Sequence, residues 1–206
     1  MLGNDLVDLA DPEAAECALH PRFDARAFAP AERARLAASP ERARLRWVLW
    51  AAKEAAWKAA RRAGLALAFH PAEVETALAP APGGAFEGFA TLSGVAFAVR
   101  VDVAGNVVHA LARAPSLAPS RLVAALRRLP AAGPAAEAAG ARALARDLAS
   151  GALAAPRSEL AVVRSGRLPE LRRGGAPVES VLSLAHHGRF AAAALALPAR
   201  SAPRAA

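Results

Sequence analysis

The stretch WVLWAAKEAAWKAARR (47–62) predicts one long helix that is apolar on nearly every side. At about 100° per residue, Glu54, Lys58 and Arg61 fall within one wedge that also holds all three tryptophans of the chain. Glu54 and Lys58 therefore form an i,i+4 pair among indoles. A buried carboxylate must be matched by a cation, and either Lys58 or a metal ion fits. The competing interpretation is an ordinary helix ion pair whose charged ends reach water.

A short strand is predicted upstream of this helix, over LGNDLVDLAD (2–11). Side chains of a strand alternate between its two faces. One face carries Gly3, Asp5 and Val7, and the other carries Asn4, Leu6 and Asp8. Asp5 is a second carboxylate that can meet Glu54 in a cleft. Two carboxylates completed by water and phosphate oxygens suit Mg²⁺, so the pair is a candidate metal site.

The rest of the chain alternates between helix-forming and strand-forming stretches. Pro30 and Pro40 delimit a short helix, and Gly64 ends the long one. The remaining predictions are an antiparallel meander between Phe69 and Ala114, a linker at 115–120, helices at 120–129 and 135–149, a strand at 159–166, a loop with an RRGG turn around Pro169, and a pair of apolar strands at 181–197. Residues after 198 predict a disordered tail.

Composition indicates a globular protein with an acidic partner. The chain has 206 residues, 55% of them hydrophobic, which suffices for a core, and a single cysteine excludes a disulfide framework or a multi-cysteine metal site. The first residues carry acids rather than a secretory signal, and no apolar run could span a membrane, so we expect a cytoplasmic protein. The net charge of +8 predicts a nucleic acid, a phosphorylated ligand or an acidic protein as partner.

Lysine is nearly absent from the basic residues. Of the 26 lysines and arginines, only Lys53 and Lys58 are lysines, and both lie in the long helix. A compact ammonium and a planar guanidinium are not interchangeable, so these two positions are candidates for a specific role.

Three stretches, GNDLVDL (3–9), WAAKEAAWK (50–58) and LSLAHHGRF (182–190), resemble the three signature motifs of the 4′-phosphopantetheinyl transferase superfamily. The second motif is the specific one. The resemblance implies an α+β fold and a transferase that moves the phosphopantetheine arm of coenzyme A to a serine of an acyl or peptidyl carrier protein, with Mg²⁺, releasing 3′,5′-ADP. Coenzyme A and an acidic carrier protein would then be the partners, with no nucleic acid and no membrane.

The order of the motifs is that of the small, trimeric type of this family, whereas the length is that of the large type. We therefore expect two pseudo-symmetric halves, each with a small antiparallel sheet packed on a long helix. Residues 1–114 would carry the two acidic motifs, residues 120–198 the histidine motif, and 199–206 a tail. The chain would be a circularly permuted monomer with one site between its halves. The alternative is a small-type domain with an insertion at 115–165, forming a trimer.

Roles of individual residues follow from the same resemblance. Asp5 and Glu54 would hold Mg²⁺ on the pyrophosphate, with Glu54, or a metal-bound water that it positions, as base towards the serine. Lys58 would contact the phosphates, and Lys53, about 100° away on the helix, would touch the edge of the cofactor or solvent. The cofactor-binding residues of the second half would be His186, Arg142 and Arg167, because an imidazole and two guanidinium groups suit phosphate oxygens. His187 is interpreted as a surface histidine.

Two positions depart from the family pattern. Ala185 stands where a serine is usual, and Val7 stands where the large type often has a third acid. These losses keep open a weak or inactive relative that binds coenzyme A or a carrier protein. A basic nucleic-acid-binding protein is a further alternative, but aromatic residues are only 5% with no tyrosine, and the arginines are dispersed.

Overall fold

A computed structural model describes residues 1–65, 68–117, 121–130 and 133–198. It is a mixed α+β fold with antiparallel sheets, as predicted. The chain up to Arg113 forms β1 (Leu2–Asp8), η1 (Pro12–Ala14), η2 (Glu16–Ala18), α1 (Phe23–Ala27), α2 (Pro30–Ala38), α3 (Arg42–Arg62), η3 (Pro71–Glu73), β2 (Glu75–Ala81), η4 (Pro82–Gly84), β3 (Ala85–Leu92), β4 (Val95–Ala104) and β5 (Val107–Arg113). The chain from Arg121 forms β6 (Arg121–Arg128), α4 (Pro134–Leu153), η5 (Arg157–Glu159), β7 (Leu160–Ser165), β8 (Leu168–Arg173), β9 (Ala176–Pro177), β10 (Val181–His187) and β11 (Phe190–Leu197).

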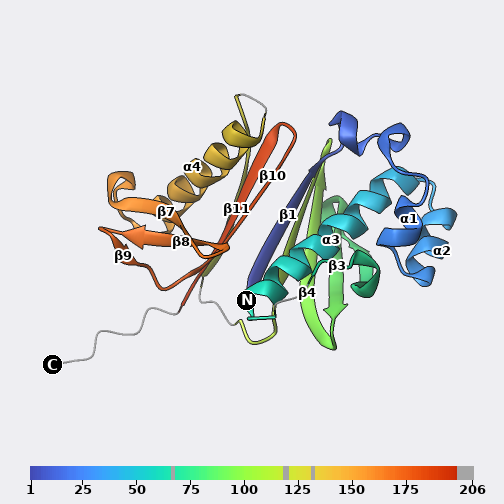
Figure 1. Cartoon of the computed structure of the whole chain (residues 1–206), viewed down its shortest axis with the longest axis horizontal. Coiled ribbons are helices and arrows are strands. Elements are labelled where there is room, and N and C mark those ends of the chain that lie inside the picture. The colour runs from blue at the N-terminus through green and yellow to red at the C-terminus, as the bar shows by residue number, and fades with distance from the viewer. Residues whose placement is uncertain (66–67, 118–120, 131–132, 199–206) are drawn as a thin grey trace.

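The first sheet has the strand order β1-β5-β4-β3-β2, and α3 lies across one of its faces (Figure 1). The alanines of α3 at 51, 52, 55, 56, 59 and 60 are all fully buried, because small side chains let the helix approach the sheet closely. Gly3 marks the closest approach: a Cβ there would lie 2.0 Å from the carbonyl oxygen of Ala55. The glycine therefore permits β1 to rest on α3.

The second part of the chain repeats this plan on a smaller scale. A three-stranded sheet of order β10-β11-β6 packs against α4, and a separate small sheet, β7-β8-β9, lies beside it (Figure 1). Its core contains Leu144 on α4, Leu182 on β10 and Leu195 on β11. The two parts meet where β1 lies alongside β10 and β11 (Figure 1).

Side chains, rather than a continuous sheet, join β1 to β10. The two strands belong to different sheets, and Ser183 Oγ accepts a hydrogen bond from the Asn4 N–H at 3.0 Å. Between the sheets, Leu6 packs with Ala185 and Ala192. The alternation predicted for β1 is confirmed, since Asn4 and Leu6 face the second sheet while Gly3 faces α3.

Two predictions about the second part were wrong. Residues 121–128, predicted as a helix, form β6 and pair with β11. Their alanine, leucine and arginine favour helices only weakly, and pairing with an apolar neighbouring strand outweighs that propensity. The stretch after 166, predicted as a loop, contains β8, which pairs with β7. The predicted tail at 199–206 lies outside the described residues. Within the described residues, no helix is long and apolar enough to cross a membrane.

Candidate active site

Asp5, Glu54 and Lys58 converge where β1 crosses α3. Lys58 Nζ lies 2.6 Å from Asp5 Oδ1 and 3.4 Å from Glu54 Oε2. The helix supplies Glu54 and Lys58 one turn apart, and the strand supplies Asp5 two residues after the close approach at Gly3. The carboxylates that the sequence separates by 49 positions thus share one cation.

Burial and mutual charge set different pKa values for the three groups. Burial raises the pKa of Asp5 well above its usual value; Lys58 opposes this effect, and the neighbouring Glu54 carboxylate adds to it. Burial also disfavours the charge on Glu54, but Lys58 and a hydrogen bond with Asp5 outweigh it and lower the pKa of Glu54. Burial opposes the charge on Lys58, yet the two carboxylates raise its pKa. Glu54 is therefore the ionised carboxylate at neutral pH, and Asp5 holds a proton more readily.

A cavity of about 610 Å³ opens over these carboxylates. Its walls combine acids, histidines and aromatic rings from both parts of the chain. They are Asp5, Leu6, Val7, Glu13, Leu19, Phe23, Trp47, Trp50, Glu54, Lys58, Leu184, Ala185, His186 and His187. The aromatic wall excludes water from one side of the cavity, which strengthens electrostatic interactions within it.

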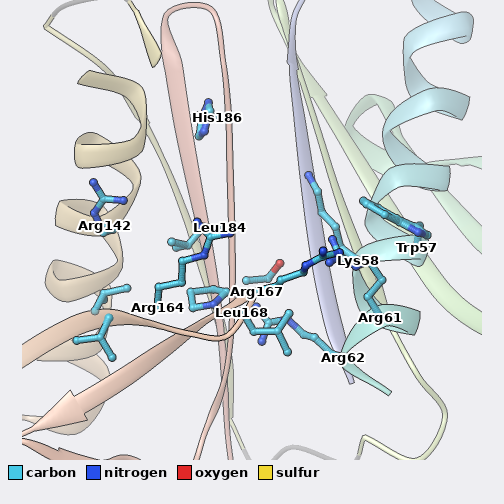
Figure 2. Close-up of a pocket in the computed structure, with 14 residues that line it drawn as sticks. Trp57, Lys58, Arg61, Arg62, Arg142, Arg164, Arg167, Leu168, Leu184 and His186 are labelled. Carbon is cyan, nitrogen blue, oxygen red and sulfur yellow. The ribbon is translucent and has the colours of Figure 1, made fainter. Parts of the chain in front are cut away.

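A second cavity of about 380 Å³, the arginine cleft, is lined by Arg61, Arg62, Arg142, Arg164 and Arg167, together with apolar side chains. Figure 2 shows Arg61 and Arg62 on one side of the cleft, Arg142 on α4 on the other, and Arg164 and Arg167 between them. Lys58, Leu184 and His186 line both cavities, so the two are neighbours. The combination is a strongly cationic cleft next to a carboxylate pair, which suits a polyphosphate ligand.

The arginine cleft contains site residues that sequence reasoning missed. Burial lowers the pKa of Arg62 to about 10, and within the part of the chain that the structure describes no carboxylate offsets this effect. The guanidinium of Arg61 lies 4.7 Å from the ring centre of Trp57, which holds it by a cation–π contact. Arg164 lies on β7, in a strand that was correctly predicted but not connected to the site. Arg61 shares the helix face of Glu54 and Lys58, but in a chain with 24 arginines nothing in the local sequence separates Arg62 and Arg164 from surface arginines.

His186, Arg142 and Arg167, which the resemblance assigns to the phosphates of coenzyme A, all line this cleft. His186 Nδ1 lies 2.9 Å from Glu137 Oε2 on α4, which orients the ring. Arg167 belongs to the turn between β7 and β8.

Lys53 is not brought to either cavity. Its ammonium is fully buried and donates to Glu32 Oε2 at 2.6 Å and to the carbonyl oxygens of Pro71 and Val74. Burial lowers its pKa, and the ion pair with Glu32 partly restores it. The predicted contact of Lys53 with the edge of the cofactor or with solvent is therefore wrong. Lys53 instead joins α2, α3 and the start of β2 beneath the site.

Ala185 and Val7, the two departures from the family pattern, are both buried apolar residues in the structure. Ala185 is buried against Leu6, so the missing hydroxyl is replaced by an apolar contact between the two sheets. Val7 belongs to the core beneath α3 and supplies no ligand. Asp8 lies on the opposite face of β1 and is bound by Arg189 through two hydrogen bonds of 2.7 and 2.8 Å, so it does not compensate for Val7.

The donor set fits Mg²⁺ with two protein ligands. Among the described residues, no group of three or more histidine, cysteine or acidic side chains could hold a metal ion. Mg²⁺ commonly takes only one or two carboxylates and completes its shell with water and substrate phosphates. Asp5 and Glu54 meet that requirement, because both face a cavity that adjoins the cationic cleft and already share one cation, Lys58.

These features define a class of site: paired carboxylates beside a strongly cationic cleft. A family model described as the 4′-phosphopantetheinyl transferase superfamily matches residues 1–112, more than half of the 206-residue chain. The chain therefore belongs to this superfamily, whose members use coenzyme A as a substrate, typically with Mg²⁺. No curated protein and no solved structure matches the chain.

Proposed function

We propose that this protein transfers the 4′-phosphopantetheine arm of coenzyme A to a serine of an acyl or peptidyl carrier protein, with Mg²⁺, and releases 3′,5′-ADP. One observation carries the proposal: Lys58 and His186 line both the carboxylate cavity and the arginine cleft. A pyrophosphate at this junction would face Asp5 and Glu54 on one side and guanidinium groups on the other.

The reaction forms a bond between the serine Oγ and the β-phosphorus of coenzyme A and breaks the phosphorus–oxygen bond to the departing 3′,5′-ADP. Asp5 and Glu54 would hold Mg²⁺, which supplies charge neutralisation for the pyrophosphate. Glu54, with its lowered pKa, accepts the proton of the incoming serine. Lys58 donates hydrogen bonds to the phosphate oxygens and offsets the charge that develops on the leaving group.

The second part of the chain contributes the binding of the nucleotide end of coenzyme A. Arg142 and Arg167 are directed to the 3′-phosphate, because a guanidinium fork matches phosphate oxygens. His186, oriented by Glu137, binds a further phosphate oxygen. Arg62 suits an anion for a separate reason. Its guanidinium charge is buried, so an anionic ligand that pairs with it binds more tightly.

The site is formed within one chain, which supports a monomer with two pseudo-symmetric halves, 1–114 and 120–198, in permuted order. Size-exclusion chromatography at low concentration tests this division. A mass near 21.1 kDa is expected. A trimer would favour the alternative, a small-type domain with an insertion at 115–165.

The carrier protein is expected to be acidic, since the chain carries a net charge of +8. We expect the reaction to take place in the cytoplasm. The test is to mix the protein with coenzyme A, Mg²⁺ and apo carrier proteins from fatty-acid, polyketide and peptide synthesis, and to measure the intact mass of each carrier. We expect the mass of one phosphopantetheine arm to be added to at least one carrier. No addition to any of them would reject the proposed transfer.

Glu54→Gln and Asp5→Asn are the matched variants for this assay. Both keep the side-chain shape while removing a carboxylate, so we expect the transfer rate to fall roughly 10²- to 10⁴-fold with the fold retained. Circular dichroism checks the fold. A fully active Glu54→Gln variant would contradict the assignment of both the base and the metal ligand.

A further inference from the structure

His187 occupies an unusual place at the end of β10. Its Nδ1 accepts a hydrogen bond from the Asp8 N–H at 3.2 Å. Asp8 is itself immobilised, because its buried carboxylate receives two hydrogen bonds from the Arg189 side chain and one from the Arg189 N–H. The amide that holds His187 is therefore fixed by the same hairpin that carries the histidine.

This hydrogen bond determines where the imidazole proton lies. A neutral imidazole has one nitrogen that donates and one that accepts. Since His187 Nδ1 accepts from an amide, the ring hydrogen must be on Nε2. Among the described residues, Nε2 has no hydrogen-bond partner. The ring is half-buried, and its Nε2–H remains open to a ligand or to water.

The ring of His187 also lines the cavity that contains Asp5, Glu54 and Lys58. The donor therefore belongs to the carboxylate cavity and not, as the sequence indicated, to the outer surface. Lys58 approaches the same cavity from α3, so His187 and Lys58 reach it from different parts of the chain.

We propose that His187 is a further catalytic residue, whose Nε2–H donates a hydrogen bond to a pyrophosphate oxygen bound over the carboxylates. This inference rests on the proposed transfer function. The ring donates through Nε2 while Nδ1 continues to accept from the Asp8 N–H. Negative charge on the phosphate oxygen grows as the bond to 3′,5′-ADP breaks, which strengthens the hydrogen bond in the transition state.

Three substitutions distinguish the role of Nδ1 of His187 as an acceptor from the role of Nε2 as a donor. In His187→Asn, the amide oxygen replaces Nδ1 as acceptor for the Asp8 N–H, but the donor into the cavity is lost. In His187→Gln, the longer amide can place an N–H near the position of Nε2. His187→Ala removes both.

Steady-state transfer kinetics of the full chain are the first readout. We expect kcat to fall roughly 10- to 100-fold in His187→Asn and His187→Ala, and His187→Gln to recover a part of the loss. KM for coenzyme A should change less than kcat, because the hydrogen bond strengthens only in the transition state. Wild-type kcat in His187→Asn would overturn the proposal, since only the Nδ1 interaction would then matter.

Nitrogen-15 NMR of histidine-labelled protein is a second readout that needs no transfer activity. The resonances of His187 are assigned by comparison with His187→Asn. We expect the Nε2-protonated form in the free protein and a shift of the Nε2 resonance when inorganic pyrophosphate and Mg²⁺ are added. An Nδ1-protonated ring, or no response of Nε2 to pyrophosphate, would overturn the inference. If the wild-type chain fails to transfer the arm to any carrier, the proposed function falls, and this spectrum alone decides the role of His187.

Discussion

The two long helices of the molecule support the site in opposite ways. Of the 21 residues of α3, 12 are buried, whereas α4 buries only four of its 20. The charged groups that α3 and β1 bring to the site are correspondingly enclosed, and Asp5 is 4% exposed. Arg142, on α4, is exposed. In the first part of the chain, the charged groups of the site are therefore also part of the buried structure, while Arg142 in the second part is exposed and lies outside the core.

The strongest test of this contrast is Lys53→Met. The substitution leaves Glu32 buried without its cation, and removing one partner of a buried ion pair costs about 3–5 kcal/mol. We expect this loss in the free energy of unfolding, measured with urea. The double variant Lys53→Met/Glu32→Gln should recover part of it, because the orphaned charge is gone. Equal stability of the two variants would show that the ion pair itself is not what holds α2 against α3.

A somewhat smaller effect is expected for Gly3→Ala. The added methyl group would meet backbone atoms of α3, 2.0 Å from the Ala55 oxygen and 2.7 Å from the Ala59 nitrogen. Because backbone must move to admit it, we expect a loss of about 2–3 kcal/mol, together with slower transfer as Asp5 shifts away from Lys58. Gly151→Ala on α4 is the matched control, since nothing lies within 4 Å of its added methyl group. A loss as large in the control would refute the argument from close approach.

Asp8→Asn tests the ion pair that holds the hairpin after β10 against β1. Hydrogen bonds from Arg189 lower the pKa of Asp8 to about 2, so the ionised carboxylate stabilises the folded state. Arg189 is 42% exposed, which reduces the expected gain to about 1–2 kcal/mol at pH 7. The contribution is present above the ordinary pKa near 4 and is lost as the pH falls towards 2. Urea unfolding of both proteins across this range should show the difference disappearing in acid; a constant difference would exclude the carboxylate as its cause.

The smallest effect on stability is expected for Arg142→Ala and Arg167→Ala. Neither residue belongs to the buried core, so the free energy of unfolding should change by less than about 0.5 kcal/mol. KM for coenzyme A should rise roughly tenfold in each, because one charge-assisted contact to phosphate is lost. Dephospho-coenzyme A, which lacks the 3′-phosphate, provides the control. If the variants discriminated against it as strongly as the wild type does, these arginines would not bind that phosphate.

The same contrast explains how much the sequence could reveal. The long helix and the faces of β1 were predictable because apolar and small residues follow the helical and strand periods there. β6 was not, since Ala, Leu and Arg suit either structure and only its partner β11 decides. The helical period correctly placed Lys53 away from the site face, but its partner Glu32 lies 21 residues earlier and no local pattern connects them.

His187 was misjudged although a usable signal existed. It follows Ser183 and Ala185 at strand spacing, so all three share the face of β10 that meets β1. In the arginine cleft, the resemblance pointed to Arg142 and Arg167, but Arg62 and Arg164 gave no comparable signal, because α3, α4 and the β7–β8 hairpin are brought together only by tertiary packing.

The side-chain contacts between β1 and β10 affect which substitutions the protein can accept during evolution. Because Ser183 and His187 cover strand amides with side chains, no shared backbone ladder fixes the offset between the two sheets. Substitution at those few positions can slide one sheet along the other while each keeps its own internal register. The spacing between the carboxylates and the guanidinium groups is thus adjustable over evolutionary time without rebuilding either core.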